Sequence, residues 1–219
     1  MTPAATLREK LQIAVFSDEL FAENCYVVRR RDTSAAMVID PGLQVRRVVE
    51  YLETSRLRVE HILLSHGHID HIAGVPSVQA AGRAAVAMHP DDRAILDWDQ
   101  FAQLPFLPPD FAPFRVDVEI RDGMTIAFQD VALRALHTPG HTQGSVCFLF
   151  GLDCFAGDTL FQRSIGRTDL PGGDPQKIML SIQNVLYRLP LKTVVHPGHG
   201  PVTTIEEEML LNPFVPQAR

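Results

Sequence analysis

The feature that most constrains this chain is a six-residue segment, His66-Gly67-His68-Ile69-Asp70-His71, in which four side chains are of metal-binding type. It follows the short apolar run Ile62-Leu63-Leu64, which predicts a buried strand. In an extended or turning backbone the first two histidines point the same way and can hold one ion. The aspartate and the third histidine come after the chain begins to bend into a helix, so they can face a neighbouring ion. A structural role does not need such a density of ligand types, and the segment therefore indicates a metal site.

Three further polar residues share a common layout downstream. His141, Asp158 and His199 each follow a glycine at the end of a predicted strand. Glycine lets the backbone turn sharply and approach a site closely, and loops at strand ends commonly carry function. Together with the first segment they make seven ligands, five His and two Asp. That is too many for one tetrahedral zinc, and it suits two ions about 3.5–4 Å apart.

The other four histidines are expected to have ordinary structural roles. His61 opens a strand, His89 precedes a proline, and His137 and His196 end strands. Contact of one of the last two with a ligand residue remains an alternative.

The periodicity of apolar residues predicts a β-rich half with a few helices, followed by a second such half. This order favours a layered α/β (α+β) sandwich, and no linker divides the chain, so residues 1–219 are expected to form a single domain. Strands are expected over 25–30, 35–39, 62–64, 84–88, 116–120, 124–128, 131–136, 145–149, 154–156 and 193–195. Helices are expected over 45–54, 75–81, 90–98, 175–189 and 205–211.

Residues 99–114 differ from the rest of the chain. They contain four prolines and four phenylalanines and read as a proline-broken loop that still needs apolar contact. Two interpretations stay open, a lid over a pocket or a plain wrap along the surface.

Composition narrows the class of partner. With a formal net charge of -6, the chain has no excess of positive charge for binding nucleic acid or an anionic membrane surface. No apolar run approaches the ~20 residues that span a bilayer. The polar N-terminus, Met1 to Lys10, lacks an apolar signal core, and the three cysteines form no CxxC pair. We therefore expect a cytoplasmic protein with reduced thiols that acts on a small molecule, and the oligomeric state stays open.

The pattern HxHxDH from His66 to His71, followed by His141, Asp158 and His199, resembles the metallo-β-lactamase superfamily. The resemblance covers nearly the whole chain. It implies an αββα sandwich, with two mixed sheets, helices on their outer faces and metal ions at one edge of the sheets.

The resemblance also implies a ligand set for two divalent metal ions. Zinc is the expected metal, with iron and manganese as alternatives. Asp70 is expected to steer the attacking water as well as bind metal, and Asp158 to bridge the ions, so both are candidate catalytic residues. Asp40 matches a family position that supports the site through a hydrogen bond to a ligand histidine, and a turn-capping role is the alternative. The implied ligands are His66, His68 and His141 for the first ion, Asp70, His71 and His199 for the second, and Asp158 between them.

Two positions separate branches of the superfamily. Asp158 stands where the best-known class of true β-lactamases has Cys, and His68 where flavodiiron proteins have Glu. The strings over 138–142, 157–161 and 164–174 resemble the glyoxalase II branch, above all its short bacterial form. That implies a thioesterase that cleaves S-lactoylglutathione, or a related thioester, through a metal-bound hydroxide. Arg163 and Arg167 are candidate contacts for an anionic substrate, with a surface or salt-bridge role as the alternative.

Two other functions are alternatives to a thioesterase. In a persulfide dioxygenase, a branch that shares the Gly-Arg-Thr-Asp string of residues 166–169, a single iron would be held by His66, His141 and Asp158. Residues 170–174 look more like the short glyoxalase branch and favour a hydrolase. Full-length glyoxalase II carries a helical C-terminal domain that holds glutathione, whereas 20 residues follow His199 here, so glutathione recognition is not implied. The third hypothesis is a metal-binding protein without enzymatic activity. The complete ligand set argues against it.

Overall fold

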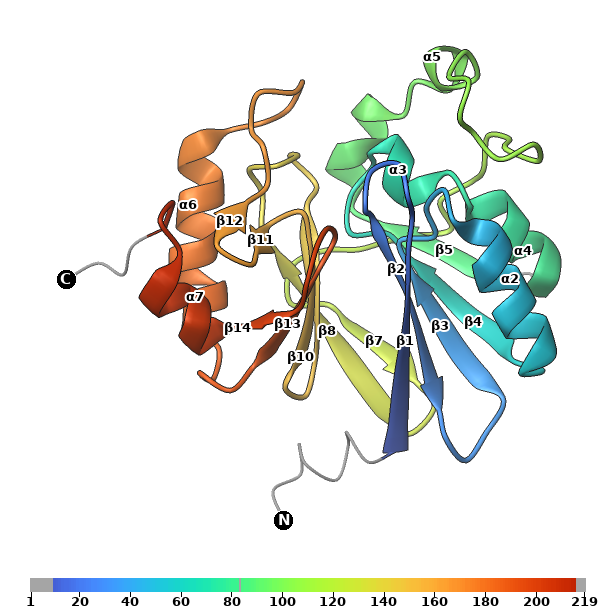
Figure 1. Cartoon of the computed structure of the whole chain (residues 1–219), viewed down its shortest axis with the longest axis horizontal. Helices are drawn as coiled ribbons and strands as arrows, with labels where there is room; N and C mark the ends of the chain where they lie inside the picture. The colour runs from blue at the N-terminus through green and yellow to red at the C-terminus, as the bar shows by residue number, and fades with distance from the viewer. Residues whose placement is uncertain (1–9, 83, 216–219) are drawn as a thin grey trace.

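The computed structural model describes residues 10–82 and 84–215, so all but the last residue of the polar segment Met1 to Lys10 lies outside the described part. Two six-stranded sheets face each other, and helices cover their outer faces (Figure 1). This is the αββα arrangement of mixed sheets that the sequence predicts, and the prediction of the fold is confirmed.

The first sheet is built from the N-terminal half of the chain. Its strands β1 to β3 pair antiparallel, and β3 to β6 pair parallel. In spatial order the strands are β1 (Leu11–Ser17), β2 (Asn24–Arg30), β3 (Ala35–Ile39), β4 (Arg58–Leu63), β5 (Ala85–Met88) and β6 (Val118–Glu119).

The second sheet is built from the C-terminal half. Only β10 and β13 pair parallel in it, and its other neighbours are antiparallel. In spatial order the strands are β14 (Thr203–Thr204), β13 (Val194–Pro197), β10 (Asp153–Gly157), β9 (Val146–Phe150), β8 (Val131–His137) and β7 (Thr125–Phe128). A small hairpin, β11 (Leu160–Phe161) with β12 (Ser164–Ile165), follows β10 in the chain.

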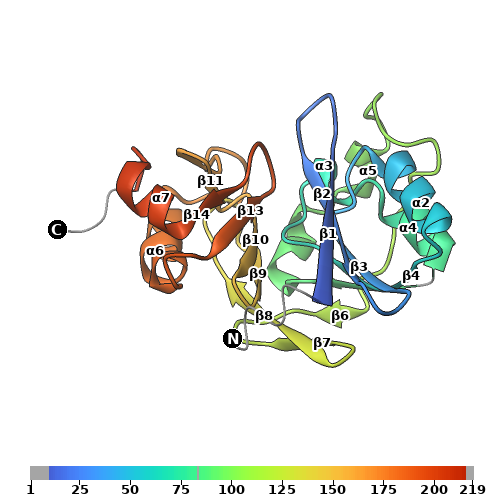
Figure 2. The same ribbon diagram turned by 60° about the horizontal axis from the view of Figure 1, so that its bottom comes forward.

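Three apolar layers hold the sandwich together. One lies between the two sheets, and the other two lie between each sheet and its helices. Figure 2 shows α2 (Val45–Thr54) and α4 (Val75–Gly82) on one side and α6 (Pro175–Asn184) and α7 (Ile205–Leu211) on the other. Helix α2 buries Val45, Val48 and Leu52, which share one face at helical spacing and pack on the first sheet.

Strand direction gathers the loops at one edge. Strands β3 and β4 run parallel, as do β10 and β13, and β8 runs the same way as β10 because β9 is antiparallel to both. The C-terminal ends of β4, β8, β10 and β13 each lead into one of the predicted ligands, and that of β3 leads into Asp40. Contacts between these loops across the two sheets bring the ligands together.

Several elements differ from the expectations, among them the short strands β11, β12 and β14, which were not expected. Strand β1 has no clean alternation of apolar and polar residues, which leaves an edge strand without a sequence signal. The helix expected over 90–98 is a 3₁₀ helix, η1 (Pro90–Ile95), followed by the short α5 (Trp98–Phe101), because Asp97 accepts a hydrogen bond from the backbone of Gln100 and caps a new helix. The helix expected over 175–189 ends at Asn184 and is followed by the 3₁₀ helix η2 (Leu186–Arg188).

No helix of the described residues combines the length and the apolar character needed to cross a bilayer. The three cysteines are buried free thiols.

Candidate metal centre

The histidine segment occupies the turn between β4 and the one-turn helix α3 (Ile69–Ile72). His68 has an extended backbone, with φ -71 and ψ 146, and stands immediately before the helix. Asp70 and His71 lie within that single turn, so they face a different direction from the histidines before it. His66 and His71 are buried, whereas His68 and Asp70 are partly exposed toward solvent.

One group of nitrogens converges from the two sheets. Nε2 of His141 lies 3.2 Å from Nε2 of His66 and 2.9 Å from Nδ1 of His68. The rings of His141 and His66 are buried. These three side chains are the predicted ligands of the first ion, and the structure brings them together.

A second group lies beside the first. Nε2 of His199 lies 3.2 Å from Nε2 of His71 and 3.4 Å from Oδ2 of Asp70. These three donor atoms are the predicted ligands of the second ion, and they too fall within 4.8 Å of one another.

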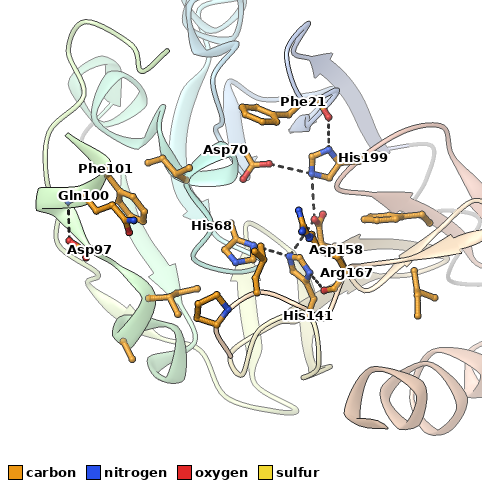
Figure 3. Close-up of a pocket in the computed structure, with 17 residues that line it drawn as sticks. Phe21, His68, Asp70, Asp97, Gln100, Phe101, His141, Asp158, Arg167 and His199 are labelled. Atoms are coloured by element: carbon orange, nitrogen blue, oxygen red, sulfur yellow. Dashed lines mark hydrogen bonds and ion pairs between the residues drawn. The ribbon is translucent and has the colours of Figure 1, made fainter. Parts of the chain in front are cut away.

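Asp158 lies between the two groups (Figure 3). Its Oδ2 is 3.4 Å from Nε2 of His141 in the first group and 3.4 Å from Nε2 of His199 in the second. Its Oδ1 is 3.4 Å from Nε2 of His71, is buried, and has no hydrogen-bond partner among the described residues. A carboxylate in this position can contribute one oxygen to each of two cations.

The hydrogen bonds of the histidines leave their inward nitrogens free to bind metal. Nδ1 of His141 is 2.7 Å from the carbonyl oxygen of Arg167, and Nδ1 of His199 is 2.8 Å from that of Phe21. Nδ1 of His71 is 3.1 Å from a carboxylate oxygen of Asp40. In the neutral form that binds metal, each of these imidazoles would donate its single N–H outward to oxygen, and the Nε2 lone pair would then point into the site.

The spacing of the donors fits metal ligands. Tetrahedral coordination with metal–nitrogen bonds of about 2.0–2.1 Å places ligand nitrogens about 3.3 Å apart. The nitrogen separations here, 2.9 to 3.2 Å, are close to that edge length. Lone pairs this close repel one another unless a proton or a cation lies between them. The donor set therefore fits divalent ions held by imidazole and carboxylate.

A pocket opens directly above these donors. It has a volume of about 720 Å³, and Figure 3 shows His68, Asp70, His141, Asp158 and His199 on one wall, facing Phe101 and Gln100 of α5. The ring of Phe21 also lines it and meets Phe106 edge-on, with ring centroids 5.4 Å apart. Part of the aromatic loop over 99–114 thus borders the entrance to the metal centre.

The sequence as a whole matches one family model. The model of the metallo-β-lactamase superfamily matches residues 18–201, which covers the whole ligand set. The chain belongs to the metallo-β-lactamase superfamily. Members of this superfamily are mostly metal-dependent hydrolases, and the two ligand groups indicate that this member binds divalent metal.

The chain aligns with curated relatives over nearly the full length of both proteins. An uncharacterised protein of Mycobacterium leprae is 40% identical over 88% of this chain and 93% of its own. The protein GloC of Haemophilus influenzae, named a hydroxyacylglutathione hydrolase, is 31% identical over 94% of this chain and 98% of its own.

Solved structures of the superfamily superimpose closely. The B3 metallo-β-lactamase BLEG-1 has a TM-score of 0.85 and 34% identity, over 93% of this chain and 99% of its own. A di-iron-bound form of TTHA1623 has a TM-score of 0.79 and 34% identity, over 92% and 100%. ETHE1 from Myxococcus xanthus has a TM-score of 0.78 and 28% identity, over 92% and 83%.

The electrostatics of the protein groups differ between the two ligand groups. Burial lowers the pKa of His66 well below its ordinary value, and burial with the neighbouring His141 lowers that of His68 to about 4. In the second group, burial also lowers the pKa of His71, but Asp158 and Asp70 outweigh it and raise the pKa to about 9. Burial also lowers the pKa of His199, but hydrogen bonds to Asp158 and Asp70 outweigh it and raise the pKa to about 11. Protons therefore compete for the second group far more than for the first.

Asp40 supports two ligand histidines from below. Its Oδ2 accepts hydrogen bonds from Nδ1 of His71 at 3.1 Å and from the Ser65 hydroxyl at 2.6 Å. That hydroxyl in turn lies 3.0 Å from Nδ1 of His66. Asp40 has a positive φ of 50, a backbone conformation that costs energy for a non-glycine residue and is concentrated at functional sites. Of the two roles left open by the sequence, a contact with a ligand histidine is present.

Asp92 is a further residue of the site that sequence reasoning missed. It is fully buried, and its Oδ2 accepts hydrogen bonds from the backbone N–H of Gly67 at 2.9 Å and the Thr142 hydroxyl at 2.8 Å. Its Oδ1 accepts one from the backbone N–H of Gly144 at 2.6 Å. It therefore fastens the His66–His68 turn to the His141 loop. In the sequence it looks like an ordinary acidic residue in the first turn of a helix, so no local signal separates it from Asp91.

The two arginines predicted to contact substrate have different surroundings. Arg167 lines the pocket, but its guanidinium donates two hydrogen bonds of 2.8 Å to Asp169. Arg163 is not among the lining residues; its backbone N–H donates to Glu208 of α7, and its side chain lies 3.8 Å from the same carboxylate. A role in substrate binding stays a prediction for both.

The other four histidines lie outside the two ligand groups. His61 bonds to the carbonyl of Ala127, and His196 pairs with Asp153 at 2.9 Å. His89 and His137 stack face to face, with centroids 4.2 Å apart and planes 7° apart. The possible ligand atoms of these two histidines and of Asp91 lie within 4.8 Å of one another. Parallel stacked rings, however, cannot both direct their in-plane lone pairs at one ion.

Proposed function

We propose that this chain is a dinuclear metal-dependent thioester hydrolase of the glyoxalase II type, acting on S-lactoylglutathione or a related thioester. The observation that carries the proposal is the position of Asp158. It contacts His141 of one complete ligand group and His71 and His199 of the other, a position from which one carboxylate can serve two cations. A site for a single ion would not need the second group.

The residues divide the chemistry between them. Two divalent ions, when bound, supply a hydroxide nucleophile near neutral pH and an electrophilic contact for the carbonyl oxygen. Asp70 lines the pocket, 3.4 Å from the inward nitrogen of His199, where it can accept a hydrogen bond from the attacking water and orient it. The acyl carbon gains a C–O bond, the C–S bond breaks, and the departing sulfur takes a proton, so one water yields one acid and one thiol.

One relative is named for thioester hydrolysis, and a second is named a zinc-dependent hydrolase. GloC of Haemophilus influenzae carries the name hydroxyacylglutathione hydrolase. BaeB of Bacillus velezensis, named a probable zinc-dependent hydrolase of polyketide biosynthesis, is 27% identical over 83% of this chain. Zinc is the metal we propose, and iron is the first alternative because TTHA1623 was solved with two irons.

The deciding experiment joins metal quantitation to a thiol-release assay. We expect about two ions per chain and release of thiol from S-lactoylglutathione without uptake of oxygen. The variant His199→Ala should lose the second ion and most of the activity, whereas His61→Ala, a histidine outside both groups, should behave like the wild type. A fully loaded protein that cleaves no thioester would refute the proposal. A β-lactam belongs in the same panel, since BLEG-1 is named a β-lactamase.

A persulfide dioxygenase is the second candidate. His66, His141 and Asp158 also form a two-histidine, one-carboxylate set of the kind that holds a single iron with open positions for oxygen. One iron per chain, with oxygen consumed on addition of glutathione persulfide, would establish this function in place of the hydrolase.

A further inference from the structure

The walls of the pocket beside the metal centre are mainly apolar. Three segments build them: the β1–β2 loop, η1 with α5, and the β11–β12 hairpin with the turn after it. The large apolar side chains on these segments are Phe21, Ile95, Phe101, Phe161, Ile165 and Leu170, and their polar neighbours are Asp97, Gln100 and Arg167.

These apolar walls are incompletely covered. Phe21 is 42% exposed, and the other five side chains are only half-buried. Concave sites that bind small molecules are commonly 300–1,000 Å³ and mainly apolar, with a few polar groups that fix orientation. At about 720 Å³ this cavity is of that kind, and its polar groups are the candidate metal ligands together with Asp97, Gln100 and Arg167.

The side chains around the pocket offer little positive charge to an anionic substrate. Arg167 is the only Lys or Arg among the described residues that line it, and its Nε and Nη2 already donate hydrogen bonds to Asp169. Asp97 adds a carboxylate to the opposite wall, where it caps the backbone of Gln100. The two carboxylates of a glutathione moiety would find no unpaired cationic side chain on these walls.

We propose that the organic part of the substrate is an apolar acyl group, carried on a neutral thiol, that packs against Phe101, Ile95 and Leu170 while its thioester carbonyl faces the metal ligands. This inference rests on the proposed thioester hydrolase function and names its substrate class. Hydrolysis consumes one water and yields the acid and the free thiol. Specificity then comes from apolar burial in a preformed pocket and not from ion pairing.

A chain-length series tests the proposal. The metal-loaded protein is assayed with acetyl, butanoyl, hexanoyl and octanoyl esters of N-acetylcysteamine, and with S-lactoylglutathione. We expect kcat/KM to rise along the series, by about tenfold or more for the first well-buried methylene groups, and the longer esters to surpass S-lactoylglutathione.

A charge-introducing variant and a matched control sharpen the test. Leu170→Lys should lower kcat/KM for the octanoyl ester and raise it for S-lactoylglutathione. Leu191→Lys makes the same change at a residue that is 50% exposed and does not line the pocket, and it should alter neither. Calorimetry with the unreactive thioether S-octyl-N-acetylcysteamine gives a second readout, because burial of apolar surface produces a negative heat-capacity change on binding.

The possible failures are distinguishable. If S-lactoylglutathione is the best substrate and Leu170→Lys changes nothing, the apolar substrate class is refuted and the thioester hydrolase stands. If no ester in the panel is cleaved by the loaded protein, the proposed function fails, and the inference fails with it.

Discussion

The carbonyl oxygen of Phe21 lies 2.8 Å from Nδ1 of His199, so a loop of the first sheet fixes the orientation of a ligand at the end of the second. The same residue places its ring in the pocket, against Phe106 of the aromatic loop. One residue therefore connects a candidate metal ligand with the entrance of the pocket. A backbone carbonyl cannot be removed by substitution, but the loop that presents it can be released.

Asp18 is the residue that holds this loop. Its two carboxylate oxygens accept backbone hydrogen bonds from Leu20, Phe21 and Glu23 at 2.6 to 2.8 Å. We expect Asp18→Ala to weaken binding of the second ion by about 10–100-fold, the usual effect of losing support behind a ligand, and to leave the first ion in place. Competition with a chromophoric chelator measures both affinities. Glu19→Ala, an exposed neighbour in the same loop, is the control, and equal weakening of both ions would contradict the prediction.

Removal of Asp92 should damage the first ligand group instead. Asp92→Ala leaves the buried N–H groups of Gly67 and Gly144 without their acceptor, at a cost of about 1–3 kcal/mol each. We expect a lower unfolding temperature and a loss of the ion held by His66, His68 and His141. Asp91→Ala changes the exposed residue beside it and should have little effect on either measurement. Full metal content in Asp92→Ala would show that the two loops hold their positions without it.

Metal binding should depend on pH in a different way at each site. His71 and His199, with pKa values raised to about 9 and about 11, carry protons at neutral pH that an entering cation must displace. His68, with a pKa lowered to about 4, does not. Affinity for the second ion should therefore rise between pH 6 and pH 8, by about tenfold per pH unit for each proton released, while affinity for the first stays nearly constant. Parallel pH profiles for the two ions would be the contrary result.

Gly198 offers a test of the bridging role proposed for Asp158. A Cβ at this position would collide with Oδ1 of Asp158 and approach the His71 ring to 2.8 Å. We expect Gly198→Ala to fold but to displace Asp158, lowering thiol-release activity by about a hundredfold or more, as misplacement by ~1 Å commonly does. Gly200→Ala is the comparison, because a Cβ there meets no atom within 4 Å and only the positive φ of 76 is strained. Equal activity in the two variants would count against the bridging role.

The parts of the fold that the sequence predicts are those with local signals. Strand β3 and helix α2 begin and end at the predicted residues, because their apolar spacing is clear and an Asp-Pro-Gly turn separates them. The ligand types were visible because four of them crowd one short segment. Asp92, Ser65 and the carbonyl of Phe21 carry no such signal. Their roles arise from contacts between loops that fold together from distant parts of the chain, which periodicity and composition do not encode.

The candidate metal ligands come from both sheets, and this affects the folding of the whole molecule. His66 and His71 follow a strand of the first sheet, and His141, Asp158 and His199 follow strands of the second. A cation bound at both sets of donors acts as a cross-link that closes loops of more than 70 residues, and the restriction this places on the unfolded chain increases with loop length. Bound metal would thus fasten the halves of the sandwich at one rim through the candidate ligand atoms, so chelation should make the molecule open there first.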